Sequence, residues 1–379
     1  MNKLFIAKRI KEERERCNLR QDDVAKYMEW DSSKHSIVVE LEAGRRELKA
    51  WELYKLAQLF HMQIEDFFKE STTIRPLILW RNKPDVTALL KERQFIQRCE
   101  DYKFLEDLLG EKLPVKRNLP KHNLDIKTAT SDWANEIADV VRNELNLGDF
   151  PATTLPRILE ENYGVRFMAL PLGNDGSAAC SIYDFGPAIL LNSDEVSWRQ
   201  SFSVAHDLFH LITWNEKVFK QFMNSPDLDK RNEQLANAFA AGLLMPENSL
   251  RQQIRRLCED EKLKFSSLVA LAREHRVSTS ALLYRLEYLG FLSKKVVEKT
   301  RKDKIFRSLD KQSFPKAHEN ATQIGDRFIR LAYLAYQFSK ISRSRLARLL
   351  NVSLITLESH LNVNGFSEID NEEISLSHS

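Results

Sequence analysis

Apolar residues recur every three to four positions along most of this chain, a spacing that is typical of amphipathic helices. The pattern begins with Leu4, Ile6 and Ile10. It continues through residues 21–28, 33–41, 51–60 and 64–68, with polar breaks between the segments. Residues 3–68 are therefore predicted to form a small bundle of five helices.

Strand patterns gather in the middle of the chain. Residues 165–170, 178–183 and 188–191 form short apolar runs that are separated by Gly173, Gly176 and a Phe-Gly-Pro turn. Helical patterns precede these runs at 133–145 and 155–163, and they follow almost without interruption from residue 196. The sequence predicts a mainly α protein with a small antiparallel sheet, which is an α+β fold.

Changes in composition divide the chain into segments. A helical module at 1–70 precedes a connecting region at 71–129, which prolines punctuate and which has one helical stretch near 87–109. The segment with the strands spans 130–290. A basic linker at 291–318, a helical hairpin at 319–363 and a Ser-rich, acidic tail at 364–379 follow, and we expect the tail to be disordered.

Charge and cysteine content exclude several classes of protein. The chain has 379 residues with 57 Lys and Arg against 54 Asp and Glu, so a strongly basic nucleic-acid coat is excluded while a local basic face is not. The four cysteines lie far apart without a Cys-x-x-Cys pair, which argues against a disulfide framework and against a thiolate zinc site. With neither a signal peptide nor an apolar run of about 20 residues, we expect a cytoplasmic protein without a membrane partner.

Residues 21–46 have the arrangement of a helix-turn-helix. A polar turn follows the helical pattern that starts at Gln21; Ser32 or Ser33 can cap the next helix, and Gly44 suits the left-handed position after it. Such a motif presents the start of its second helix to the major groove, while basic side chains contact phosphates. The candidate DNA-binding residues are Gln21, Ser33, Lys34, Ser36, Arg45 and Arg46.

This module resembles the lambda-repressor-like, or XRE, family of helix-turn-helix domains. The resemblance covers about residues 4–68 and rests on Gln21, Val24, Ala25, Ile37, Glu40, Glu42 and Gly44. It implies five helices, operator DNA as the partner and a homodimer. A protein-binding module without DNA contacts stays open as an alternative, because the charge of the module is near zero.

A second set of residues has the spacing of a metal site. His206 and His210 lie four positions apart in an apolar helical segment, so both imidazoles face the same side and can meet one ion. Glu233 is a candidate third ligand, 23 residues later at the start of another apolar helix. Buried polar residues on two neighbouring helices are typical of a metal ligand set.

These segments resemble the ImmA/IrrE family of metallopeptidases over roughly residues 130–290. The matching motifs are Phe202-x-x-Ala205-His206-x-x-x-His210 and Glu233-x-x-Ala236-Asn237-x-Phe239-Ala240. The resemblance implies a zincin-like fold with zinc as the cofactor and His206, His210 and Glu233 as its ligands. It also implies that the strand near residues 188–191 pairs with an extended substrate.

One residue departs from the motif of that family. The family has H-E-x-x-H, in which the Glu is the general base, whereas this chain has Asp207 and reads H-D-x-x-H. The carboxylate is withdrawn by about 1.5 Å, one C–C bond. Three interpretations stay open: an attenuated protease, a protease that is active in one state, and a sensor that keeps the metal. We favour Asp207 as a catalytic residue with some retained peptidase activity.

Together these patterns predict a transcription regulator of bacterial or phage type. Its N-terminal module would bind operator DNA, and its zinc metalloendopeptidase-like domain would act as a hydrolase on itself or on a companion helix-turn-helix repressor. One alternative is a non-enzymatic repressor whose peptidase-like domain is a metal-bound sensor. The other is an antitoxin or adaptor that binds a toxin partner.

Overall fold

The computed structural model describes residues 3–17, 19–30, 35–60, 62, 64–68, 76–84, 88–114, 116–174, 176–258, 262–312 and 326–367. Two of the predicted DNA-binding residues, Ser33 and Lys34, lie outside these ranges, and the side chain of Ser36 is not described either. Most of the predicted tail, residues 368–379, also lies outside them.

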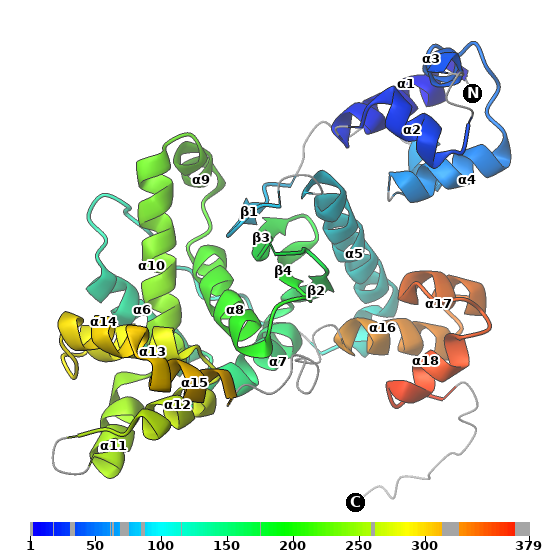
Figure 1. Cartoon of the computed structure of the whole chain (residues 1–379). Helices are drawn as coiled ribbons and strands as arrows, with labels where there is room; N and C mark the ends of the chain where they lie inside the picture. The colour runs from blue at the N-terminus through cyan, green and yellow to red at the C-terminus, as the bar shows by residue number, and fades with distance from the viewer. Residues whose placement is uncertain are drawn as a thin grey trace, which may run out of the picture.

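The described chain is mostly helical, as the sequence predicts (Figure 1). Its helices are α1 (Lys3–Arg16), α2 (Gln21–Tyr27), α3 (His35–Glu42), α4 (Ala50–Leu59), η2 (Ile64–Phe68), α5 (Ala88–Leu109), η3 (Gly110–Lys112), α6 (Ser131–Glu144), α7 (Pro151–Tyr163), α8 (Ser197–Ile212), α9 (Glu216–Met223), α10 (Pro226–Leu244), α11 (Glu247–Leu257), α12 (Phe265–Glu274), α13 (Thr279–Tyr288), α14 (Lys294–Lys302), α15 (Lys304–Gln312), α16 (Asp326–Gln337), α17 (Arg343–Leu350) and α18 (Leu357–Val363). The strands are β1 (Leu79–Trp80), β2 (Arg166–Leu170), β3 (Ala178–Tyr183) and β4 (Gly186–Asn192). Within the described ranges, no helix is both long and apolar enough to cross a membrane.

The N-terminal module closes around its own apolar core. Ile10, Val24, Val38 and Phe60 are buried in it and come from α1, α2, α3 and the end of α4. The fifth helical pattern forms a short 3-10 helix, η2, rather than an α-helix. Gly44 has a φ of +70°, which is the left-handed conformation that the sequence predicts after the second helix of the motif.

The sheet is mixed, not fully antiparallel, and this corrects the prediction. Its strand order is β1-β3-β4-β2; β3 pairs antiparallel with both β1 and β4, but β2 runs parallel to β4. The apolar strand β4 inserts between β2 and β3 because it is buried on both faces. A continuous apolar run is the signature of such an interior strand.

Helices cover both faces of the sheet (Figure 1). Cys180, Ile189 and Leu191 share a core with residues of α8, whereas Ala188 and Leu190 share another with Phe95 of α5. Side chains alternate between the faces of a strand, so β3 and β4 contribute to both cores. The sheet therefore forms the central layer that carries α8.

The predicted connecting region contributes to the packing throughout. It supplies the edge strand β1 and the 22-residue helix α5. Along α5, Phe95 lies in the core beneath the sheet, and Tyr102, Leu105 and Leu109 pack against α16 to α18. A two-residue strand has too short a pattern to be detected in a sequence.

Residues 291–318 also differ from the predicted basic linker over their described part. They form the short helices α14 and α15, whose Val297 and Phe306 are buried in the core of the α8 segment. The charged residues that suggest a linker occupy the outer faces of these helices, because only one stripe of each is apolar. The predicted C-terminal hairpin comprises the three helices α16, α17 and α18.

Candidate metal centre

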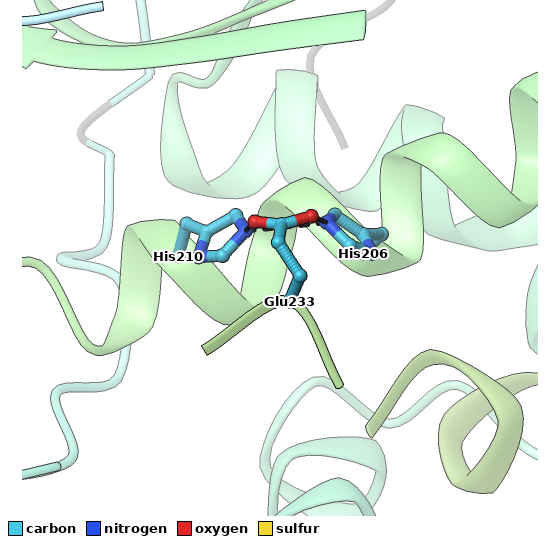
Figure 2. Close-up of side chains that lie close together, drawn as sticks. All are labelled: His206, His210 and Glu233. Carbon is cyan, nitrogen blue, oxygen red and sulfur yellow. Dashed lines mark hydrogen bonds and ion pairs between the residues drawn. The ribbon is translucent and has the colours of Figure 1, made fainter. Parts of the chain in front are cut away.

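Two buried helices position the candidate ligands. Helix α8 packs against the sheet on one side and contacts α10 on the other, so it is buried along most of its length. His206 and His210 lie one turn apart on α8, with exposed fractions of 0% and 3%. Glu233, on α10, faces both imidazole rings (Figure 2). Its side chain is 28% exposed, so it is less buried than the sequence suggests.

The three side chains have the spacing of a tetrahedral ligand set. The Nε2 atoms of His206 and His210 are 3.2 Å apart. Glu233 places Oε2 at 3.0 Å from Nε2 of His206 and Oε1 at 3.2 Å from Nε2 of His210. Zinc bonds of about 2.0–2.1 Å in a tetrahedron give ligand–ligand distances of about 3.3 Å. The cluster therefore fits a zinc ion with three protein ligands.

Two of the three side chains have the protonation state that a cation needs. Burial lowers the pKa of His206 to about 4, which keeps this imidazole neutral. Burial alone would lower the pKa of His210. The hydrogen bond to Glu233 and the charge of its carboxylate outweigh this effect, so the pKa of His210 is raised. Burial would raise the pKa of Glu233, but hydrogen bonds from both histidines hold it well below its ordinary value. Glu233 and His206 therefore have the protonation states that zinc binding requires, and a zinc ion would displace a proton from His210.

An asparagine of α10 orients His206 and a second one lies near His210, and the sequence analysis did not single out either as a site residue. Oδ1 of Asn237 lies 3.1 Å from Nδ1 of His206, so it accepts the proton there and leaves Nε2 free for a ligand bond. Nδ2 of Asn232 lies 3.5 Å from Nδ1 of His210, at the limit of a hydrogen bond. Asn237 follows Glu233 by four residues, one helical turn, and that spacing is the signal available in the sequence.

Asp207 is buried beside the cluster without a hydrogen-bond partner. It is 1% exposed, and neither carboxylate oxygen has a partner among the described residues. Burial raises its pKa to about 7, against the opposing charges of His210 and Arg81. A buried, unpartnered carboxylate calls for a missing water or ion. Its presence next to His206 is a second observation that fits a hydrated metal.

A cavity of about 620 Å³ lies one residue away from the cluster. Asn237, which bonds His206, is part of its wall. Other lining residues are Arg81, Trp198, Phe202, Tyr284 and Tyr288. Arg81 comes from the end of β1 and donates a hydrogen bond to Oγ of Ser203 at 2.9 Å. Arg81 and Ser203 are more than 100 residues apart in the chain, so the sequence does not indicate that they are in contact.

The predicted substrate-binding strand is not available for pairing. Residues 188–191 belong to β4, which has β3 on one side and β2 on the other. Every position of the predicted stretch is paired with β2 or β3, because β4 is interior to the sheet. The expectation that an extended substrate pairs with β4 is therefore wrong.

The described DNA-binding candidates differ in their contacts. Arg45 is 62% exposed and pairs with Glu40 at 3.0 Å. Arg46 is 27% exposed and forms two bonds, of 2.6 and 3.0 Å, with the buried carboxylate of Glu52. Gln21 donates to Glu42 at 2.9 Å. Of these two arginines Arg45 is thus the more exposed, while Arg46 pairs with a buried carboxylate of the module.

Comparisons with known proteins agree with one part of this picture. No curated protein matches the chain. A solved structure described as a Mycobacterium tuberculosis transcriptional regulator is similar at 13% sequence identity with a TM-score of 0.32, over 49% of this chain and 51% of that chain. The chain thus spans about half the length of that relative. Residues 160–287, which include His206, His210 and Glu233, match the family model of the IrrE N-terminal-like domain, Peptidase_M78.

Proposed function

We propose that this chain is a DNA-binding transcription regulator whose α8–α10 unit is a zinc-dependent endopeptidase. The observation that carries the proposal is the cluster of His206, His210 and Glu233, with donor atoms at tetrahedral spacing. The match of residues 160–287 to the Peptidase_M78 family supports a metallopeptidase. The substrate would be this protein or a companion helix-turn-helix repressor, and cleavage would relieve repression.

Each residue of the site has a distinct role in this proposal. His206, His210 and Glu233 would hold a zinc ion, which would supply Lewis acidity to the site. Asp207 accepts a proton on its unpartnered carboxylate and acts as the general base. Asn237 fixes the tautomer of His206 from behind. The cavity that Asn237 lines gives a peptide side chain room one residue away from the cluster.

The N-terminal module supplies DNA binding in the same proposal. In this proposal α2 and α3 are the two helices of the helix-turn-helix. Ser33 and Lys34 precede α3 in the sequence, and Ser36 is its second residue. Arg45 and Arg46 are the proposed phosphate contacts. A homodimer would place two such helices on successive turns of an operator.

Metal content and cleavage are measured on the same preparations of full-length protein. Wild type purified without added metal should hold about one zinc per chain. The double substitution His206→Ala with His210→Ala should remove it. His122→Ala with His360→Ala is the matched control, because these histidines lie outside the cluster. Zinc that is absent from wild type, or that persists in the first double variant, contradicts the ligand assignment.

The peptidase role is tested by an isosteric change of the base. Asp207→Asn should keep the zinc and lose cleavage of candidate repressors and of the protein itself, because an amide cannot accept the proton. Loss of a positioned general base lowers rates by about 10²–10⁴. Should zinc-loaded wild type cleave no candidate while its DNA binding is intact, the unit is a metal-bound sensor rather than an enzyme.

A further inference from the structure

Strand β3 has one edge that β4 does not cover, and a short segment of this chain lies along it. Leu79 pairs with Cys180 and Trp80 with Ala179, both antiparallel. The pairing continues beyond β1, where the amide of Arg81 donates to the carbonyl of Ala178 at 2.9 Å. Residues 77–82 therefore contact β3 as an added strand, which is how extended peptides bind a sheet edge.

Two further bonds lengthen this contact at its ends. The amide of Ser177 donates to the carbonyl of Asn82 at 3.2 Å, and Oγ of Ser181 donates to the carbonyl of Leu77 at 2.7 Å. Main-chain groups of residues 77–82 thus provide most of the bonds. Because main-chain bonds do not depend on sequence, another extended peptide can make the same set.

The side chains of the segment alternate between the two faces of the sheet. Leu77 and Leu79 pack with the core on the side of α8, whereas Ile78 and Trp80 pack on the side of α5. Arg81 continues the first set, because its guanidinium bonds Ser203 and lies 5.2 Å from the ring centre of Phe202 on α8. On the face toward α8 the segment therefore presents two aliphatic side chains, Leu77 and Leu79, followed by one basic side chain, Arg81.

The basic end of the segment lies next to the metal cluster. Ser203 precedes His206 by three residues, so the two occupy neighbouring positions on one face of α8. Arg81 also lines the cavity that Asn237 lines, and Asn237 bonds His206. A peptide that follows the path of β1 would thus deliver its next residues to the cavity beside the cluster.

The segment comes from outside the unit that it completes. Residues 77–82 precede the Peptidase_M78 match at 160–287 by some 80 positions, between the helix-turn-helix module and α5. Only two of these residues form a regular strand. A short edge strand donated from elsewhere in the chain is easier to displace than an interior one.

We infer that the edge of β3 opposite β4 is the peptide-binding edge of this site and that residues 77–82 of the same chain occupy it as a competing peptide. The ligand class is an extended peptide with aliphatic side chains at two alternate positions and a basic side chain at the next. A substrate in trans must displace β1 before it reaches the cluster. The inference rests on the proposed function because the peptide that displaces the strand would be the substrate of the proposed peptidase.

The test measures peptide binding in full-length, zinc-loaded protein. The probe is a fluorescent peptide with the sequence of residues 76–83, and a scrambled peptide of the same composition is its control. Leu79→Asp places a carboxylate in the apolar face of β1 and should release the segment, so the affinity for the probe should rise at least tenfold over wild type. Leu257→Asp makes the same change at an exposed site on α11 and should leave the affinity unchanged.

A milder variant and a second readout keep the test decisive if Leu79→Asp does not fold. Arg81→Ala removes the bond to Ser203 and the contact with Phe202, and it should raise the affinity about threefold. In parallel, the amide hydrogens of β3 that point toward β1, which belong to alternate residues of 178–181, should exchange faster in each folded variant, and the probe should restore their protection. Affinities within twofold of wild type in folded variants overturn the inference.

The outcomes separate this inference from the proposed peptidase activity. Tighter probe binding by the variants without any cleavage supports the occupied edge and counts against the enzyme. Cleavage of a repressor at equal rates by wild type and variants, with unchanged probe binding, supports the enzyme and overturns the occupied edge. Tighter binding with faster cleavage supports both.

Discussion

The hydrogen bond between Asn237 and His206 allows a sharp test of the metal centre. In Asn237→Ala the ring of His206 loses the acceptor 3.1 Å from Nδ1, so the tautomer that presents Nε2 to the metal is no longer fixed. Loss of such a partner lowers metal affinity by about 10–100-fold, or about 1.4–2.7 kcal/mol. Asn237 is exposed, so water can replace part of the amide. We therefore expect the lower limit, about tenfold.

The assay is competition for zinc between the full-length protein and a chromogenic chelator at fixed pH. Asn237→Asp retains an acceptor at the same place and should bind zinc at least as tightly as wild type. Asn224→Ala is a matched control, since Asn224 bonds the carbonyl of Lys220 and has no contact with the cluster. If Asn237→Ala binds zinc within twofold of wild type, His206 is not oriented in this way or is not a ligand.

Three further outcomes follow from other parts of the structure. Burial raises the pKa of Glu160 to about 7, so the folded state keeps a proton that the unfolded state releases near pH 4.5. The free energy of unfolding should therefore fall as the pH rises between these two values. Urea unfolding at pH 5 and pH 8 measures this fall, and Glu160→Gln should remove up to about 3 kcal/mol of it. Arg45→Ala should weaken DNA binding across sequences and reduce the slope of log affinity against log salt by about one, with an unchanged melting temperature; an unchanged slope would mean that Arg45 meets no phosphate. Phe95→Ala should cost about 3–5 kcal/mol of unfolding free energy because Phe95 is fully buried between α5 and the sheet, and a loss below 1 kcal/mol would contradict that packing.

Local spacing explains why the ligand cluster could be predicted from the sequence. The positions of His206 and His210 on one helix face follow from the period of the α-helix alone. Glu233 could be proposed because a carboxylate in an apolar helix needs a partner. The structure brings these three side chains together as the sequence predicts. The same argument could have identified Asn237, because it follows Glu233 by four residues and so lies on the same face of α10.

Contacts between distant segments could not be predicted in the same way. The apolar residues of α5 indicate that the helix has partners but do not say which, and these partners come from the sheet and from α16 to α18. The order of the strands also depends on how the connections between them cross the sheet. Three successive apolar runs do not reveal these connections, so they were consistent with an antiparallel sheet as well as with a mixed one. Nothing in the sequence of residues 77–82 connects Arg81 to Ser203.

The shared core of α5 and the C-terminal helices bears on how the chain is synthesised. Tyr102, Leu105 and Leu109 are buried against Phe328 and Leu331, which leave the ribosome roughly 220 residues later. At a synthesis rate of about 5–20 residues per second, this apolar face of α5 stays exposed for some 10–40 s before its packing partners are made. During that interval nascent α5 is a target for chaperones. A ribosome that stalls before α16 would release a product whose uncovered face marks it for degradation.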